Sequence, residues 1–122
     1  MAFDFEKLDV YQKALMAVDE AYKVTKTFPS EERFGLIDQL RRAAISVALN
    51  IAEGSGRTKR DFCHFLRNAR ASCYECIAVL QISRRRSYLS QSQLNDCAGF
   101  FVEISKRAQS AVRYRLWHTL VF

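Results

Sequence analysis

Four cysteines are the residues of this 122-residue sequence whose type and spacing first suggest a metal or thiol site. Cys73 and Cys76 have Cys-x-x-Cys spacing, and Cys63 with His64 lies ten residues earlier. This spacing alone is weak evidence for zinc, which needs four converging ligands. Cys73, Cys76 and Cys97 fall instead on apolar stripes of helical patterns, where cysteine behaves as a small hydrophobe. We therefore expect core cysteines and neither a metal nor another cofactor, with a cysteine-based metal or redox site as the weaker alternative.

Other catalytic constellations are missing from the sequence. Neither His64 nor His118 has a nearby serine or cysteine in a nucleophile-elbow motif. The Glu-x-x-His pairs of di-iron helical bundles do not occur, and the stretch 53–57 lacks the spacing of a phosphate-binding loop. The sequence therefore predicts a protein that is not an enzyme and has no catalytic residues.

Basic residues give a stronger signal. The net charge is +6, but residues 1–40 hold eight acidic and five basic residues (net −3), whereas residues 41–122 hold five acidic and fourteen basic residues (net +9). Arginine outnumbers lysine twelve to two after residue 40, and arginine pairs well with both phosphate and carboxylate. The candidate nucleic-acid contacts are Arg41, Arg42, Arg57, Lys59, Arg60, Arg67 and Arg70. Contacts between subunits would use the same preference, and solvated helix faces are a third interpretation, so all three stay open.

Two polar residues break the local rules of the second helical segment. Asn50 places an amide on an apolar stripe, where it needs a hydrogen-bond partner and can fix an association state. Glu53 is an acid in the last turn of a helix, where the helix dipole disfavours it. We expect a nearby cation, with Arg57 the closest in sequence. Asn50 and Glu53 are therefore predicted to form a structural polar network, with a functional surface as the alternative.

The elements that must position these residues are four amphipathic helices. Apolar or small residues recur alternately three and four apart in each segment, which puts one stripe on each helix against its neighbours. The predicted stripes are Leu8, Tyr11, Leu15, Val18, Tyr22 and Thr25; Leu36, Leu40, Ala43, Val47 and Asn50; Phe62, Leu66, Ala69, Cys73, Cys76 and Leu80; and Leu94, Cys97, Phe101, Ile104, Ala108 and Ala111. We predict one all-α domain over residues 1–122, an antiparallel up-down-up-down four-helix bundle with helices over about 6–28, 35–53, 59–85 and 91–115.

The breaks between the segments support these bounds. Phe28-Pro29 should stop the first helix, because proline disfavours helical geometry in the residue before it. The stretch 54–56, Gly-Ser-Gly, should end the second helix through a left-handed residue. Thr58 to Asp61 and Ser90 to Gln93 have capping-box spacing. In such a bundle Arg57–Arg60 and Arg84–Arg86 lie at opposite ends of the third helix, so a single monomer offers no continuous basic track.

The chain has no apolar run of the ~18 residues that would suggest a membrane span. Residues 1–10 contain three acids and no apolar signal-peptide region. We therefore expect a cytoplasmic protein without a membrane partner.

One family shares several of these residues. The pieces are Phe28-Pro29, Gly35-Leu36, Gln39-Leu40-Arg41-Arg42-Ala43-Ala44, Ser46, Asn50-Ile51-Ala52-Glu53-Gly54, Arg57, Phe65-Leu66 and Tyr74-Glu75. Together they closely resemble the four-helix-bundle family encoded in intervening sequences of bacterial 23S rRNA genes. Leu8 to Ala14 resembles the opening motif of that family, with Tyr11 where a tryptophan is frequent. The likeness extends to about Arg107.

The resemblance implies an antiparallel four-helix bundle that assembles as a ring-shaped pentamer, and an rRNA-associated label that comes from gene location. It also implies kinship in fold with the accessory variability determinants of diversity-generating retroelements, which bind protein and nucleic acid beside a reverse transcriptase. This chain departs from the family at Cys73 and Cys76, where Leu-type residues are more usual, and in its apolar tail 116–122. That tail could dock on a neighbouring subunit or extend across its own bundle.

The residues and the resemblance together favour a non-enzymatic oligomeric scaffold. It would bind rRNA or another nucleic acid, or a nucleic-acid-processing protein, through arginine-rich surfaces. The alternative is a pure protein-protein interaction module in which the arginines make subunit contacts.

Overall fold

The computed structural model describes residues 4–114 and 117–120 of the chain. Four α-helices make up nearly all of this part: α1 (Asp9–Thr25), α2 (Leu36–Ser55), α3 (Lys59–Arg85) and α4 (Gln91–Tyr114). Three short 3-10 helices accompany them: η1 (Asp4–Lys7), η2 (Ser30–Glu32) and η3 (Trp117–Leu120). The described residues contain no strand, which confirms the all-α prediction.

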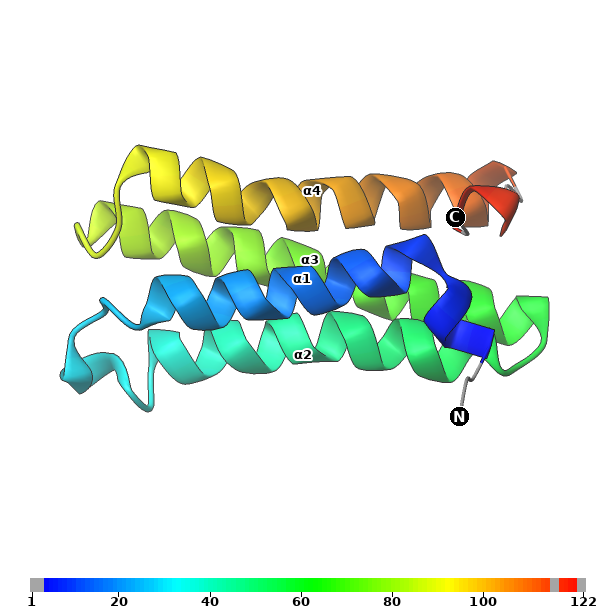
Figure 1. Cartoon of the computed structure of the whole chain (residues 1–122), viewed down its shortest axis with the longest axis horizontal. Coiled ribbons are helices and arrows are strands. Elements are labelled where there is room, and N and C mark those ends of the chain that lie inside the picture. Colours follow the sequence, from blue (N-terminus) through cyan, green and yellow to red (C-terminus); the bar gives the residue numbers. More distant parts are fainter. Residues whose placement is uncertain (1–3, 115–116, 121–122) are drawn as a thin grey trace.

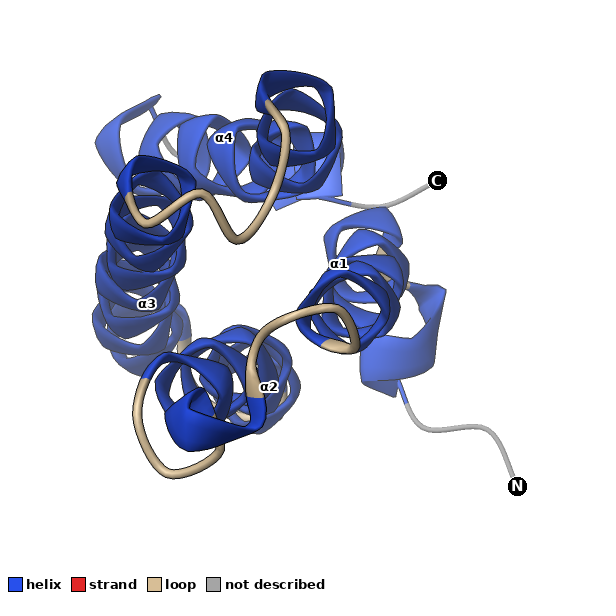
Figure 2. Ribbon diagram, turned by 90° about the vertical axis from the view of Figure 1, so that its left-hand side faces the viewer, coloured by secondary structure: helices blue, strands red, loops and turns tan. Residues whose placement is uncertain are grey.

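The helices run alternately up and down (Figure 1). Seen end-on, α1, α2, α3 and α4 occupy four corners in that order, so that α4 also lies next to α1 (Figure 2). The α1–α2 and α3–α4 connections are at one end of the bundle, and the α2–α3 turn is at the other. The predicted up-down-up-down bundle is confirmed, and Arg57–Arg60 and Arg84–Arg86 do lie at opposite ends of α3.

The core confirms the predicted stripes on α2, α3 and α4 but corrects the one on α1. The buried residues of α1 are Val10, Ala14, Ala17, Ala21, Val24 and Thr25. Leu15 and Tyr22, both predicted to face the core, are each 39% exposed. In α1 two adjacent stripes have helical spacing, and the sequence prediction chose the one with the larger side chains. Both stripes have helical periodicity, so spacing alone does not decide between them, and the stripe that contains Ala14, Ala17 and Ala21 is the buried one.

The first helix is also shorter than the predicted 6–28. It begins after the separate turn η1 and ends at Thr25, three residues before Phe28. Leaving the helix there lets the Phe28 side chain turn inward, where it is 6% exposed and its ring centre lies 5.6 Å from that of Tyr88. Pro29 then holds an extended backbone with ψ 148°.

The turn between α2 and α3 depends on glycine for a different reason than the predicted one. Helix α2 continues to Ser55, and no glycine in the described part of the chain has a positive φ. Gly54 is buried inside the last turn, where an added Cβ would lie 2.6 Å from Cβ of Phe65 and 2.9 Å from Cδ1 of Phe62. Gly54 therefore permits the close approach of α2 and α3 and does not serve as a left-handed cap.

The starts of α3 and α4 follow standard capping chemistry. Thr58 Oγ1 accepts a hydrogen bond from Asp61 N at 3.2 Å. Ser90 and Gln93 form the predicted reciprocal capping box, with Gln93 N donating to Ser90 Oγ at 3.1 Å and Ser90 N donating to Gln93 Oε1 at 2.8 Å. Among the helices in the described ranges, none is long and apolar enough to cross a bilayer.

Candidate nucleic-acid interface

The cysteines pack as the sequence predicts. Cys73 and Cys76 are fully buried and Cys97 is 1% exposed. Burial raises the pKa of the Cys73 thiol to about 12, and burial, assisted by the charge of Glu20, raises the pKa of Cys97 to about 12. Cys63 alone of the four is half-buried. Within residues 4–114 and 117–120, no three His, Cys, Asp or Glu side chains are grouped so as to hold a metal ion.

Asn50 and Glu53 each have a partner, but not the same one. Asn50 Nδ2 donates to the Ser46 carbonyl at 2.8 Å and to Ser46 Oγ at 3.1 Å, and Ser46 Oγ lies 3.0 Å from Ser72 Oγ of α3. Glu53 forms an ion pair with Arg57 at 2.9 Å. The amide is therefore satisfied through an α2–α3 contact, and the acid is neutralised at the end of its own helix by the cation that the sequence indicates.

Arg41 is engaged inside the bundle. Its Nε donates to Oγ1 of Thr25 at 2.9 Å, and its guanidinium lies 4.4 Å from the ring centre of Tyr22. Thr25 is buried and in turn donates to the Ala21 carbonyl at 2.8 Å. Arg41 therefore ties α2 to α1, and its role as a phosphate contact stays a prediction.

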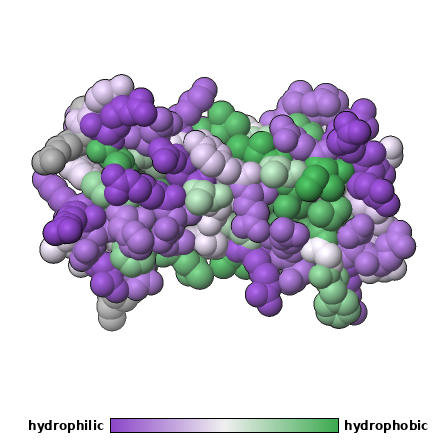
Figure 3. All heavy atoms as spheres, turned by 180° about the vertical axis from the view of Figure 1, so that it is seen from behind, coloured by the Kyte–Doolittle hydropathy of each residue, from purple (hydrophilic) through white to green (hydrophobic). Residues whose placement is uncertain are grey.

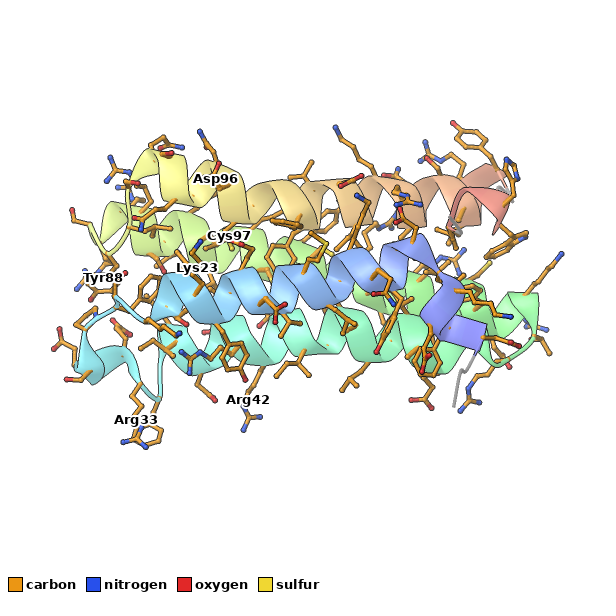
Figure 4. All side chains as sticks on the ribbon, in the orientation of Figure 1. Lys23, Arg33, Arg42, Tyr88, Asp96 and Cys97 are labelled. Carbon is orange, nitrogen blue, oxygen red and sulfur yellow. The ribbon has the colours of Figure 1, made fainter. Side chains whose placement is uncertain are left out.

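Arg42 and Arg57 lie at the surface but have acidic partners. Arg42 points away from the bundle (Figure 4) and pairs with Asp38 at 3.0 Å. Arg57 pairs with Glu53 and stacks 5.1 Å from the ring centre of Phe65. Exposed pairs of this kind are weak, so a phosphate could compete for either guanidinium, but each is partly neutralised.

The remaining four predicted contacts form one basic stripe on α3, which consists of Lys59, Arg60, Arg67 and Arg70. At about 100° per residue, these positions fall within about 100° of arc on the helix. In the described part of the chain none of the four side chains has a hydrogen bond or ion pair with another residue. Their charge is therefore available to an external anion.

Three hollows mark the surface, and their charges differ. The first, along the outer face of α2, is lined by Arg42, Ile45, Ser46, Leu49, Asn50 and Glu53. The second, between α1 and α4 where Figure 4 labels Lys23, Asp96 and Cys97, is lined also by Glu20, Val24, Thr27 and Gln93. The third, which we call the basic hollow, is lined by Lys59, Arg60, Cys63, Arg67, Val112 and Trp117. The first is balanced and the second is acidic, whereas the basic hollow carries three cations and no acid.

The basic hollow is closed on one side by the C-terminal turn η3. Trp117 stacks on Phe62 of α3, with ring centres 5.6 Å apart and planes 20° apart, and Leu120 is 1% exposed. Trp117 and Leu120 of the apolar tail therefore pack on their own bundle, in a turn separate from α4 and not as an extension of that helix. Residues 116, 121 and 122 of the tail lie outside the described residues. This packing brings the end of α4 and η3 beside the start of α3, and the hollow that results has a volume of about 420 Å³.

The local electrostatics favour an anion at this site. Lys59 and Arg60 occupy the first turn of α3, together with the single acid Asp61. Cations there oppose the positive end of the helix dipole, whereas an anion is stabilised by it. A bound phosphate would relieve the repulsion between the two cations and the helix end.

Sequence reasoning found the cations of the basic hollow but missed Trp117, Val112 and Cys63. The helical spacing of residues 59, 60, 63, 67 and 70 could have placed Cys63 among the basic residues. Val112 could have been placed, because the end of the predicted fourth helix lies beside the start of the third in an antiparallel bundle. Trp117 could not be placed, because its position depends on the tail folding back along α3.

In Figure 3, which shows the bundle from behind, polar residues predominate toward the end with the α2–α3 turn and hydrophobic ones gather toward the other end.

The fold and the hollow define an antiparallel four-helix bundle with a cationic, aromatic-lined surface site. The chain matches the family model described as 23S rRNA-intervening sequence protein over residues 6–110. The chain therefore belongs to this family, as the sequence resemblance indicates.

A solved structure supports the fold. It is a protein of unknown function from the S23 ribosomal protein family of Bacteroides thetaiotaomicron VPI-5482, with a TM-score of 0.79 and 24% sequence identity. The alignment covers 85% of this chain and 98% of that chain. At this identity the likeness establishes the fold alone. A comparison with curated proteins gave no match.

Proposed function

We propose that this protein is a non-enzymatic, cytoplasmic, oligomeric scaffold that binds rRNA or another structured RNA through the basic stripe of α3. The observation that carries the proposal is the set of four cations without acidic partners in the described residues, three of which line the basic hollow. The family description mentions 23S rRNA because of where the genes lie, so RNA as the polyanion is proposed from the unpartnered cations. A pentameric assembly is proposed from the family resemblance.

Nucleic-acid binding by such a surface is electrostatic and therefore depends on salt. Each cation that contacts a phosphate contributes about 1 to the slope of log affinity against log salt concentration. In a ring-shaped oligomer, the basic stripes of several copies could contact one RNA together. The RNA would then meet more cations than the interrupted basic surface of a single bundle offers.

A filter-binding titration against rRNA fragments at two salt concentrations tests this function. The double variant Arg60→Gln and Arg67→Gln should lower the affinity at low salt and reduce the salt slope by about 1 to 2. Arg85→Gln, which removes an exposed cation from the opposite end of the same helix, is the matched control and should change little. No binding of any rRNA fragment by the unaltered protein at low salt would reject the RNA proposal.

A second candidate function is a protein-protein interaction module that uses the outer face of α2. Leu49 is 62% exposed there beside half-buried Ile45, with Arg42 and Glu53 at the rim. An exposed apolar residue with a charged rim is typical of a contact surface between proteins. Under this hypothesis Leu49→Asp should convert the oligomer to smaller species on a sizing column, and Arg42→Ala should do so more weakly. Variants that stay assembled but lose RNA binding would favour the first function.

A further inference from the structure

The basic hollow combines cations with an aromatic side chain. A site for phosphate alone requires the cations but not the aromatic ring. Trp117 lines the hollow and is half-buried, so that part of its indole is open to a ligand. Phe62 supports the indole by stacking, with the two ring centres 5.6 Å apart. A ring held by another ring is a rigid platform, because its rotamer is already restricted by packing.

Such a platform suits an unpaired base and not a duplex. In double-stranded RNA the bases are stacked and paired inside the helix, and proteins reach mainly the phosphates and 2′-hydroxyls. Single strands present bases that stack on aromatic side chains while a basic groove follows the backbone. The volume of about 420 Å³ lies within the range of ~300–1,000 Å³ that is usual for ligand sites. The hollow can therefore admit a nucleotide rather than a phosphate alone.

The basic stripe continues along α3 beyond the hollow, so that the backbone of one RNA strand could follow it. Lys59 and Arg70 are eleven residues apart, which corresponds to about 16 Å along the helix. A stripe of this length can accompany the backbone of a few nucleotides, whereas the hollow with its aromatic wall lies at one end of it.

We propose that the basic hollow binds a single-stranded segment of RNA, with backbone phosphates on the cations of α3 and one unpaired base stacked on Trp117. This inference rests on the proposed RNA-binding function, because it specifies which form of RNA the same site takes. No bond is formed or broken, and the discrimination between single and double strands comes from stacking.

Trp117 is the single tryptophan of the chain, so that its fluorescence reports on the hollow alone. The experiment titrates the full chain at low salt with four probes: a short single-stranded oligoadenylate, an abasic oligonucleotide of the same charge, an RNA duplex and polyglutamate. Tryptophan fluorescence and the anisotropy of a labelled probe are followed together. We expect the oligoadenylate to bind and to quench the tryptophan, and the abasic strand and the duplex to bind through charge with little quenching.

Two variants separate stacking from charge. Trp117→Leu should weaken oligoadenylate binding about 5- to 100-fold, which corresponds to the loss of one stacked base, and should leave the affinity for the abasic strand unchanged. Arg60→Gln should weaken both strands to the same degree. Trp117→Phe keeps an aromatic ring at the position that packs on Phe62. This variant should therefore retain most of the preference for the oligoadenylate. Thermal unfolding of each variant shows whether the fold is intact.

The outcomes are distinct. Quenching by the oligoadenylate, with a preference for it over the abasic strand that Trp117→Leu removes, supports the inference. Failure of every RNA probe to bind would reject the proposed function itself. RNA binding without tryptophan quenching, no preference of the unaltered protein for the oligoadenylate over the abasic strand, an unchanged oligoadenylate affinity in Trp117→Leu, or equal quenching by the duplex would overturn the inference while leaving the RNA function standing. Quenching by polyglutamate equal to that by RNA would overturn it in favour of an acidic protein partner.

Discussion

At the scale of single residues, close packing controls what the bundle tolerates. Gly54 lies where α2 meets α3, in contact range of Phe65 and Phe62, and Phe62 also stacks with Trp117 of the basic hollow. The absence of a side chain at Gly54 is therefore connected to the geometry of the candidate site through the ring of Phe62.

Gly54→Ala should destabilise the protein by about 1–3 kcal/mol, because its Cβ would meet Cβ of Phe65 at 2.6 Å and both helices would have to shift. Gly56→Ala is the matched control, since the nearest atom to its added Cβ is 4.0 Å away and a compatible Gly-to-Ala change stabilises by about 0.4–1 kcal/mol. Urea unfolding of the two variants measures the difference. Equal stability of both would mean that the α2–α3 contact is looser than described.

The buried thiols make stability depend on alkaline pH. The pKa of Cys73 is raised by burial to about 12 in the folded protein, against an ordinary value of 9.0. Between these values the unfolded chain loses a proton that the folded chain keeps, so the free energy of unfolding falls as pH rises above about 9. Below pH 9 the stabilisation is fully present.

We expect Cys73→Ala to unfold with a shallower pH dependence than the unaltered protein, by up to about 1.4 kcal/mol per pH unit for one thiol. Urea titrations from pH 8 to pH 10 measure the slopes. Cys63→Ala, at a half-buried position, is the control for removing a thiol. A slope identical in Cys73→Ala and in the unaltered protein would contradict the burial of this thiol as the cause.

At the scale of elements, the helices follow from patterns that the sequence displays, with one exception that is instructive. On α2, α3 and α4 the predicted stripe coincides with the buried one, so periodicity locates the core face. On α1 the buried stripe is Val10, Ala14, Ala17, Ala21 and Val24, and larger residues such as Leu15 lie beside it. Hydrophobicity favours the wrong stripe there, because the larger side chains are the more hydrophobic although they lie outside the buried face.

Helix α3 ends at Arg85, as predicted, but the left-handed residue that closes it was not predictable from residue types. Ser87 has φ 64°, and the hydrogen bonds from Ser87 N to Arg84 O and from Tyr88 N to Ser83 O, at 2.9 Å and 3.0 Å, define a Schellman motif. Glycine is usual at this position, and the serine gives no signal of a left-handed residue.

Ser87→Gly should therefore stabilise the protein by about 0.5–1 kcal/mol, because glycine adopts the left-handed conformation without the steric cost that a Cβ atom brings. Part of this gain is lost, because glycine has more conformational freedom in the unfolded chain. Thermal or urea unfolding measures the gain. Ser92→Gly, in the first turn of α4, should instead be neutral or destabilising. A loss of stability in Ser87→Gly would be incompatible with the left-handed conformation at the end of α3.

At the scale of the whole molecule, the candidate site exists because η3 folds onto the bundle. The cations of α3 are visible in the sequence, but the hollow that they line needs η3 beside α3. The same tail contributes Leu120, which belongs to the buried core together with residues of the four helices. No short-range pattern fixes such a return, since it depends on the space that the assembled helices leave open.

Leu120→Ala tests whether this tail belongs to its own bundle or to a neighbour. Leu120 is 1% exposed, so its truncation should cost about 2–4 kcal/mol. Because the contact is within one chain, the loss should be the same at low and high protein concentration, whereas a contact between subunits would make it concentration-dependent. Urea unfolding at two concentrations a hundredfold apart measures this, with His118→Ala, an exposed change in the same turn, as the control. A loss that appears at one concentration only would assign the tail to a neighbouring subunit, and the basic hollow would then be completed between copies of the chain.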